Sequence, residues 1–161
     1  MCRRSRGHLG NAGYYVHRLL GDPEQSRDLL QEIWIEVFRR LSGLQAPEAF
    51  RVWLYRVAHH RAVKHLRRKG VEARGQKMIA YATEESVDDE FELLENAELV
   101  HHALGQLSLE HREVLTLRFL EDLSVEEISE VVGCSEGTTK SRVHYGKLAM
   151  RTIIEKERAN G

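Results

Sequence analysis

The sequence predicts an all-α protein: two small helical domains joined by a flexible acidic linker, the second being a helix-turn-helix domain. Its 161 residues are 42% hydrophobic and 30% charged, which fits one soluble domain or two small ones. Only two prolines occur, and the abundant Leu, Glu, Arg and Ala favour helix over sheet. A third observation, the segregation of charge along the chain, divides it into parts.

Charge is segregated although the formal net charge is only -1. Residues 1–75 hold 15 Lys+Arg against 7 Asp+Glu, whereas residues 76–110 hold 1 against 9. Further along, residues 111–136 hold 2 basic and 7 acidic residues, and residues 137–161 hold 6 basic and 2 acidic residues. The two basic segments are therefore candidate phosphate-binding faces.

Two helices are expected in the first domain. Asp22, Pro23 and Gln25 suit the cap, the first position and the third position of a helix that Ser42-Gly43 ends. Its predicted inward stripe consists of Leu29, Leu30, Ile33, Trp34, Val37, Phe38 and Leu41. A second helix should run from Pro47 to Gly70. Its expected inward residues are Phe50, Trp53, Leu54, Val57, Ala58 and Leu66.

Helical periodicity weakens after Gly70, where acidic residues accumulate up to about Asn96. We interpret residues 71–96 as a flexible acidic linker. The two domains are therefore expected over residues 1–70 and 97–161.

The second domain should contain helices over residues 97–107 and 109–120, followed by two more. Ser124 and Glu127 have the spacing of a capping box before a short helix, and Gly133 would make the turn that ends it. A last helix follows Ser135. Its predicted inward stripe is Thr139, Val143, Gly146, Met150 and Ile153.

The order of short helix, turn and longer basic helix is that of a helix-turn-helix, whose second helix enters the major groove of DNA. A three-helix bundle without a role in DNA binding could show the same caps and turn. Charge favours the DNA-binding alternative, because the face opposite the inward stripe is mainly polar or basic. That face presents Gly137, Lys140, Ser141, His144, Tyr145, Leu148 and Arg151.

Two stretches resemble sigma factors of the extracytoplasmic-function type. The stretch from Leu115 to Arg151, with LSVEEISEVVGCSEGTTKSRVHYGKLAMR, is similar to region four of that family. The stretch from Gly21 to Arg68, with DLLQEIWIEVFRRL and FRVWLYRVAHHRAVKHLRR, is similar to region two. Both occur in the family's order with a linker of suitable length between them. The resemblance implies a transcription initiation factor that binds core RNA polymerase and promoter DNA, and it allows an anti-sigma factor as a further partner.

The resemblance also implies roles for individual positions. Polymerase binding falls on Asp28, Gln31 and Glu32. Capture of the melted minus-ten element falls on Arg56, His60, Arg61 and Lys64. Recognition of the upstream, minus-thirty-five element falls on Lys140, Ser141, Arg142, His144 and Tyr145. Trp53 and Tyr55 invite stacking on extruded bases, although the spacing of Trp53 from Phe50 and Val57 favours a core position.

Several positions depart from the family's pattern. His60 stands where Asn is frequent, Tyr145-Gly146 where Arg-Ala is common, and Thr139 where Val is usual. The glycine-containing start, Met1 to Tyr15, stands where the family has its first helix. The sequence therefore leaves open which bases of the minus-ten element are selected. It also leaves open whether the first helix of the family is present. Arg142 either contacts DNA or forms an ion pair with Glu126 or Glu127.

No motif in the sequence predicts a catalytic or metal-binding site. Adjacent histidines such as His59-His60 point about 100° apart on a helix and cannot jointly hold one metal ion, so neither metal nor cofactor is expected. Cys2 and Cys134 form no C-x-x-C pair, which suits a reducing cytoplasm. No stretch approaches the roughly 20 apolar residues of a membrane span, so no membrane insertion is expected.

Two other functions compete with the initiation factor. A stand-alone helix-turn-helix regulator would bind duplex operators without polymerase, and the region-two motif would then have no purpose. An enzyme acting on nucleic acid is the least supported, because the sequence offers no metal-carboxylate or nucleophile constellation.

Overall fold

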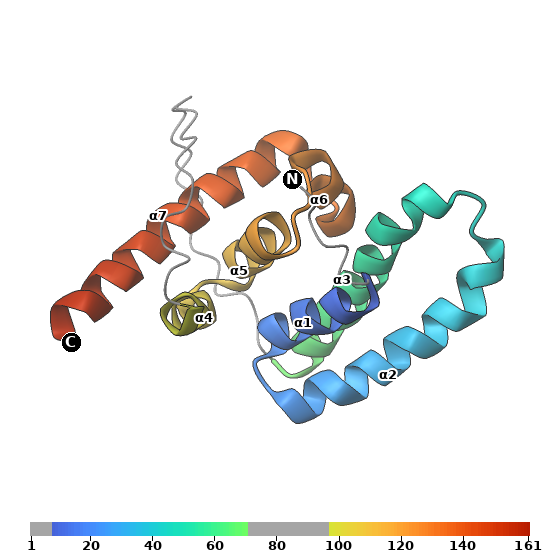
Figure 1. The fold of residues 1–161 in the computed structure, drawn as a ribbon, viewed down its shortest axis with the longest axis horizontal. Coiled ribbons are helices and arrows are strands. Elements are labelled where there is room, and N and C mark those ends of the chain that lie inside the picture. Colours follow the sequence, from blue (N-terminus) through green and yellow to red (C-terminus); the bar gives the residue numbers. More distant parts are fainter. Residues whose placement is uncertain (1–7, 71–96) are drawn as a thin grey trace.

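The computed structural model describes residues 8–70 and 97–161, which contain helices and no strand. The all-α prediction is confirmed, whereas the acidic linker predicted over 71–96 lies outside the described residues. The elements in chain order are α1 His8–Leu20, α2 Pro23–Arg40, η1 Leu41–Gly43, η2 Pro47–Ala49, α3 Phe50–Arg68, α4 Ala97–Gln106, α5 Leu109–Leu115, η4 Thr116–Leu120, α6 Val125–Val132 and α7 Glu136–Asn160 (Figure 1).

The first three helices pack on one another. The predicted start of α2 is confirmed, because the Asp22 side chain accepts hydrogen bonds from the backbone N–H groups of Glu24 and Gln25 and Pro23 occupies the first turn. The helix α1 is present, although sequence reasoning left it open, and four of its residues from position 12 onward, where burial is described, are buried. These are Ala12, Tyr15, Val16 and Leu19.

The inward stripe predicted for α2 is correct in its first part and wrong at its end. Leu29, Ile33 and Val37 are buried, but Phe38 is 72% exposed and Leu41 is also exposed. The reason is geometric. Leu29, Ile33 and Val37 recur every four residues and face the core, whereas Phe38 lies about 100° further round the helix than Val37.

The C-terminal helices follow their predicted caps closely. Ser124 and Glu127 form the capping box, with reciprocal hydrogen bonds of 2.8 and 3.1 Å. Gly133, with φ of 74°, ends α6 in the left-handed conformation that favours glycine. The Ser135 side chain then caps α7.

The inward stripe of α7 is confirmed from Thr139 to Met150 and shifts by one residue at its end, where Ile154 is buried and Ile153 only partly so. A strict seven-residue repeat drifts by about 20° per heptad on a straight helix, which moves the buried position to the next residue. Gly146 lies so close to α5 that a Cβ atom there would be 3.2 Å from Leu115 Cγ.

The N-terminal and C-terminal helices also contact each other. The helix α3 packs against α6, and α1 packs against α5 and η4. Buried side chains from both groups form one hydrophobic core, and polar contacts cross between them. The hydroxyl of Tyr55 donates to the Glu121 carboxylate at 2.6 Å, and His59 Nδ1 lies 3.2 Å from a Glu113 oxygen. None of the described helices has the length and apolar character of a membrane span.

Candidate nucleic-acid interface

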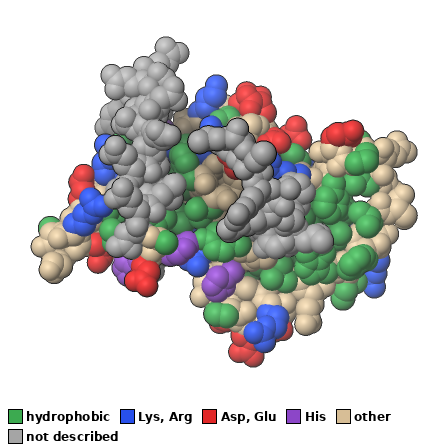
Figure 2. Space-filling model, viewed as in Figure 1, with side chains coloured by type: hydrophobic (Ala, Val, Ile, Leu, Met, Phe, Trp, Pro, Cys, Tyr) green, Lys and Arg blue, Asp and Glu red, His purple; other side chains and the backbone are tan. Residues whose placement is uncertain are grey.

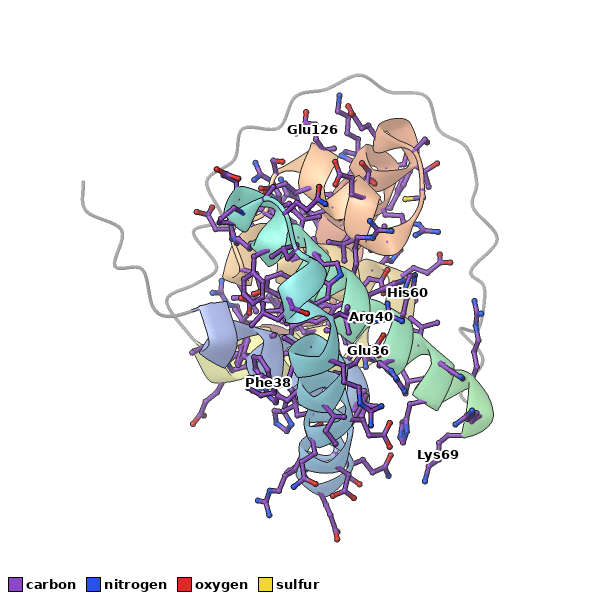
Figure 3. All side chains as sticks on the ribbon, turned by 90° about the vertical axis from the view of Figure 1, so that its right-hand side faces the viewer. Glu36, Phe38, Arg40, His60, Lys69 and Glu126 are labelled. Atoms are coloured by element: carbon purple, nitrogen blue, oxygen red, sulfur yellow. The ribbon has the colours of Figure 1, made fainter. Side chains whose placement is uncertain are left out.

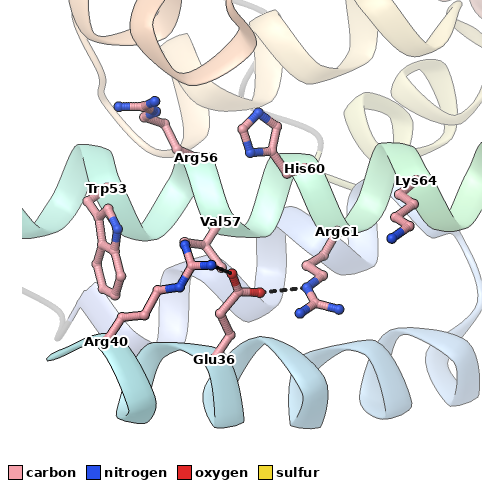
Figure 4. A pocket seen from close by; sticks show the side chains of 8 residues that line it. All are labelled: Glu36, Arg40, Trp53, Arg56, Val57, His60, Arg61 and Lys64. Carbon is pink, nitrogen blue, oxygen red and sulfur yellow. Dashed lines mark hydrogen bonds and ion pairs between the residues drawn. The ribbon is translucent and has the colours of Figure 1, made fainter.

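A hollow of about 390 Å³ lies between α2 and α3 (Figure 4). All four side chains that sequence reasoning assigned to the minus-ten element line it, namely Arg56, His60, Arg61 and Lys64. The other lining residues are Glu36, Arg40, Trp53 and Val57. Residues 53, 56, 60 and 64 recur every three or four positions, so α3 presents them on one side. The predicted group is therefore brought together, while its role stays a prediction.

The opposite side of α3 packs on the core. Leu54, Ala58 and Ala62 are fully buried and fix the helix on the core. The basic side chains consequently lie on the other side of the helix. In Figure 4, Arg61 and Lys64 are directed toward α2, and Arg56 and His60 lie on the side of the α3 ribbon away from α2. Arg56 and Lys64 are exposed, so the guanidinium group of Arg56 and the ammonium group of Lys64 are available to phosphate oxygens.

Among the described residues that line this hollow, Glu36 is the one carboxylate, and Glu32 lies 3.8 Å from Arg61. The Glu36 side chain, 17% exposed, accepts a hydrogen bond from Arg61 Nε at 2.6 Å and pairs with Arg40 at 3.3 Å. Sequence reasoning missed both Glu36 and Arg40. The available signal was their i,i+4 spacing, which is typical of an ion pair along a helix.

The environment of His60 lowers its pKa. Burial is the largest cause, followed by the neighbouring His59 and the positive charge of Arg56. A lowered pKa favours the neutral imidazole at neutral pH. His60 is therefore suited to donate or accept a hydrogen bond at the rim of the hollow, whereas Arg56 and Lys64 supply charge.

A second hollow of about 520 Å³ continues the basic surface along α3. It shares His60 and Lys64 with the first and adds His59, Val63, Arg67 and Arg68. The last turn of α3 thus extends a positively charged track of the kind that follows a nucleic-acid backbone.

The two aromatic residues considered for base stacking differ in position. Trp53 packs on Phe50, with ring centroids 5.9 Å apart, and also lines the hollow. It therefore combines a core contact with an accessible edge. Tyr55 is only 1% exposed, so the stacking role considered for it is wrong for this structure. The reason is its place on the side of α3 that α1 and Glu121 cover, where its ring meets Tyr15 edge to face.

The residues assigned to the upstream element lie on α7, the second helix of the helix-turn-helix. Lys140 is exposed, and Ser141, His144 and Tyr145 are partly exposed, with the rings of His144 and Tyr145 in edge-to-face contact. Arg142 is 18% exposed and pairs with Glu110 of α5 at 3.3 Å. Its partner is thus neither of the acids at residues 126–127 that sequence reasoning considered.

The residues assigned to polymerase binding form an exposed face of α2. Asp28, Gln31 and Glu32 are all exposed. The same face continues toward the C-terminal end of the helix with Ile35 and Phe38, two exposed hydrophobic residues that sequence reasoning did not assign to binding. Figure 2 shows hydrophobic side chains gathered over the α2–α3 end of the visible face. Figure 3 shows Phe38 and the pair Glu36 and Arg40 on opposite sides of α2. Phe38 and the hollow thus lie on different sides of α2, whereas Glu32 lies 3.8 Å from Arg61, a residue that lines the hollow.

Comparison with known proteins identifies both halves of the chain. The family model described as Sigma-70 region 2 matches residues 6–71, and the model described as Sigma-70, region 4 matches residues 97–150. The RNA polymerase sigma-H factor of Pseudomonas aeruginosa is 32% identical over 159 residues, covering 88% of this chain and 82% of the relative. The ECF RNA polymerase sigma factor SigL of Mycobacterium tuberculosis is 32% identical over 148 residues, covering 88% and 81%.

Solved structures show the same fold. The sigma factor RpoE in complex with the anti-sigma factor NepR from Bartonella quintana superposes with a TM-score of 0.71 at 19% identity, covering 92% of each chain. CnrH in complex with the cytosolic domain of CnrY superposes with a TM-score of 0.61 at 22% identity, covering 91% of this chain and 82% of CnrH. Both sigma regions, in their order and over most of the chain, show that it belongs to the extracytoplasmic-function (ECF) group of RNA polymerase sigma factors, proteins of transcription initiation.

Proposed function

We propose that this chain binds core RNA polymerase and directs it to specific promoters. In this proposal residues 1–70 engage the minus-ten element, residues 97–161 engage the minus-thirty-five element, and residues 71–96 link them. The observation that carries it is the hollow between α2 and α3, where five basic or imidazole side chains and Trp53 line one cavity. Such a mixture of cations and an aromatic edge suits a single strand with extruded bases.

The hollow would act by trapping melted DNA, with no catalytic group of its own. Unstacking a base from the duplex costs a few kcal/mol. Stacking of that base on an aromatic side chain returns about 1–3 kcal/mol, and phosphate contacts of Arg56 and Lys64 add further attraction. The melted state is then stabilised over the duplex. The proposed location is the cytoplasm, where the polymerase acts.

The upstream element would be met by α7. Lys140, Ser141, His144 and Tyr145 offer a cation, a hydroxyl and two polar rings to phosphates and base edges. Arg142 would have to leave Glu110 to reach DNA, so its contribution requires that this ion pair opens. An anti-sigma factor is a further proposed partner, because the similar RpoE structure holds one.

Polymerase docking is proposed for the exposed face of α2. Replacing Asp28 and Glu32 together by Ala is expected to weaken capture of core polymerase and to leave helical content unchanged, because both side chains are exposed. Pull-down with circular dichroism measures this. The double variant Glu130→Ala with Glu155→Ala removes the same charge from exposed positions elsewhere and is the matched control. Equal capture by both folded variants would contradict the assignment.

The whole proposal is tested by run-off transcription with purified core polymerase on a library of promoter templates. The chain is expected to confer transcription on a subset of templates and, by itself, to bind their duplexes weakly, since two small basic faces make few phosphate contacts. Tight sequence-specific binding without polymerase, together with no transcript, would instead support the operator-binding regulator.

A further inference from the structure

A basic hollow without an acid would bind phosphate in preference to a base. Guanidinium groups pair readily with phosphate oxygens, and Arg40, Arg56, Arg61 and Lys64 all line the hollow between α2 and α3. A strand bound in this way would be held by its backbone alone. Phosphate contacts position a strand and carry no sequence information.

Glu36 changes the chemistry of this hollow. Its carboxylate holds Arg61 at 2.6 Å and Arg40 at 3.3 Å, so two of the four cations already have an anionic partner. The negative charge of Glu36 also repels a phosphate at the same place. The cations left for the backbone are Arg56 and Lys64, which are exposed.

Glu36 also retains hydrogen-bonding capacity of its own. An ionised carboxylate has about four acceptor sites, and the contacts to Arg61 and Arg40 use one on each oxygen. The side chain is 17% exposed and lies among residues that line the cavity, so an incoming group can reach it (Figure 4). Carboxylates accept hydrogen bonds from exocyclic amino groups of bases, as Glu and Asp do with cytosine.

We propose, on the basis of the function proposed above, that Glu36 is a specificity-determining residue. It disfavours phosphate in the hollow and accepts a hydrogen bond from the exocyclic amino group of an extruded adenine or cytosine. Thymine, which presents carbonyl oxygens and no amino group, is disfavoured there. Arg61 and Arg40, which pair with the same carboxylate, flank this proposed base-binding site.

The test uses the full chain with single-stranded oligonucleotides of deoxyadenosine, deoxycytidine or thymidine, and an abasic strand of equal length. Fluorescence anisotropy gives the affinity for each at several salt concentrations. The Glu36→Met variant keeps the side-chain length and removes the charge. Glu24→Met, an exposed position on the first turn of α2, loses the same charge outside the hollow and is the control.

The unmodified chain is expected to prefer the adenine and cytosine strands over thymine by roughly 5- to 150-fold, the range of one good base contact. Glu36→Met should abolish that preference and bind the abasic strand more tightly. Its salt dependence should steepen by roughly 0.7 for one added phosphate contact. Glu36→Asp should restore part of the preference, and Glu24→Met should keep it.

A purely structural ion pair gives a different result. If Glu36→Met melts at a lower temperature but keeps the base preference and the salt dependence, Glu36 only joins α2 to α3 and the proposal is wrong. The outcome is separable from the proposed function. Promoter-dependent run-off transcription by the unmodified chain, without any preference for amino-bearing bases, would overturn the role of Glu36 alone.

Discussion

Val143→Asp is expected to destabilise the C-terminal helices by several kcal/mol. Val143 is buried in the stripe by which α7 packs on α5 and α6. A carboxylate at this position would lose its hydration without gaining an ion-pair or hydrogen-bond partner. Substitutions that bury an unpaired charge are among the most destabilising. Thermal unfolding followed by circular dichroism should show a lowered midpoint and loss of cooperativity. This loss of stability should be detected before any change in promoter selectivity.

Substitutions on the opposite face of α7 provide the comparison. Lys140→Ala, His144→Ala and Tyr145→Ala should leave the melting temperature nearly unchanged, because these side chains are exposed or partly exposed. Each should alter recognition of the upstream element by about 1–3 kcal/mol if it makes a good base contact. Early melting of these three variants beside a stable Val143→Asp would mean that α7 is rotated from this assignment.

The parts of this fold that sequence reasoning predicted correctly depend on residues close together in the chain. The Asp22 cap of α2 and the capping box of Ser124 and Glu127 involve partners within three residues. Such signals are local, because they satisfy the free N–H groups of the first turn. The grouping of Arg56 and Lys64 on one side of α3 is likewise set by helical periodicity.

The missed features depend on which helices meet in space. Phe38 belongs to the apolar stripe predicted from the sequence. Whether its side chain is covered depends on where α1 and α3 lie against α2. Arg142 pairs with Glu110, 32 residues away, and Arg61 with Glu36, 25 residues away. Periodicity shows on which side of its helix a residue lies. It does not identify the residue on the neighbouring helix that will face it.

A second large effect is expected from Tyr55, which lies where α3 meets the C-terminal helices. Tyr55→Ala should cost about 3–5 kcal/mol, the usual range for truncating a large buried aromatic side chain. Its ring packs on Tyr15 with centroids 5.7 Å apart, and its hydroxyl donates to Glu121 at 2.6 Å. Tyr55→Phe keeps the ring and should cost about 1–3 kcal/mol, because the buried carboxylate of Glu121 loses a donor. Urea unfolding of both variants measures the difference.

A double variant separates the lost hydrogen bond from lost packing. Tyr55→Phe combined with Glu121→Leu removes both partners and should recover much of the stability that Tyr55→Phe loses, since an apolar pair leaves no orphaned acceptor. Arg51 donates to the backbone carbonyl of Glu121, which remains in the double variant. Additive losses from the two single changes would show that the side chains are not coupled.

The pH dependence identifies the ionisable group in this contact. Burial raises the pKa of Glu121, against the lowering effects of the Tyr55 hydrogen bond and the Arg51 charge. Because the folded pKa lies above the unfolded one, this carboxyl stabilises the fold fully below its unfolded pKa, and the contribution is lost as pH rises through the folded pKa. The stability of Glu121→Gln relative to the unmodified chain should therefore increase from acid to neutral pH. A stability difference that stays constant over this range would show that ionisation of Glu121 does not control the contact.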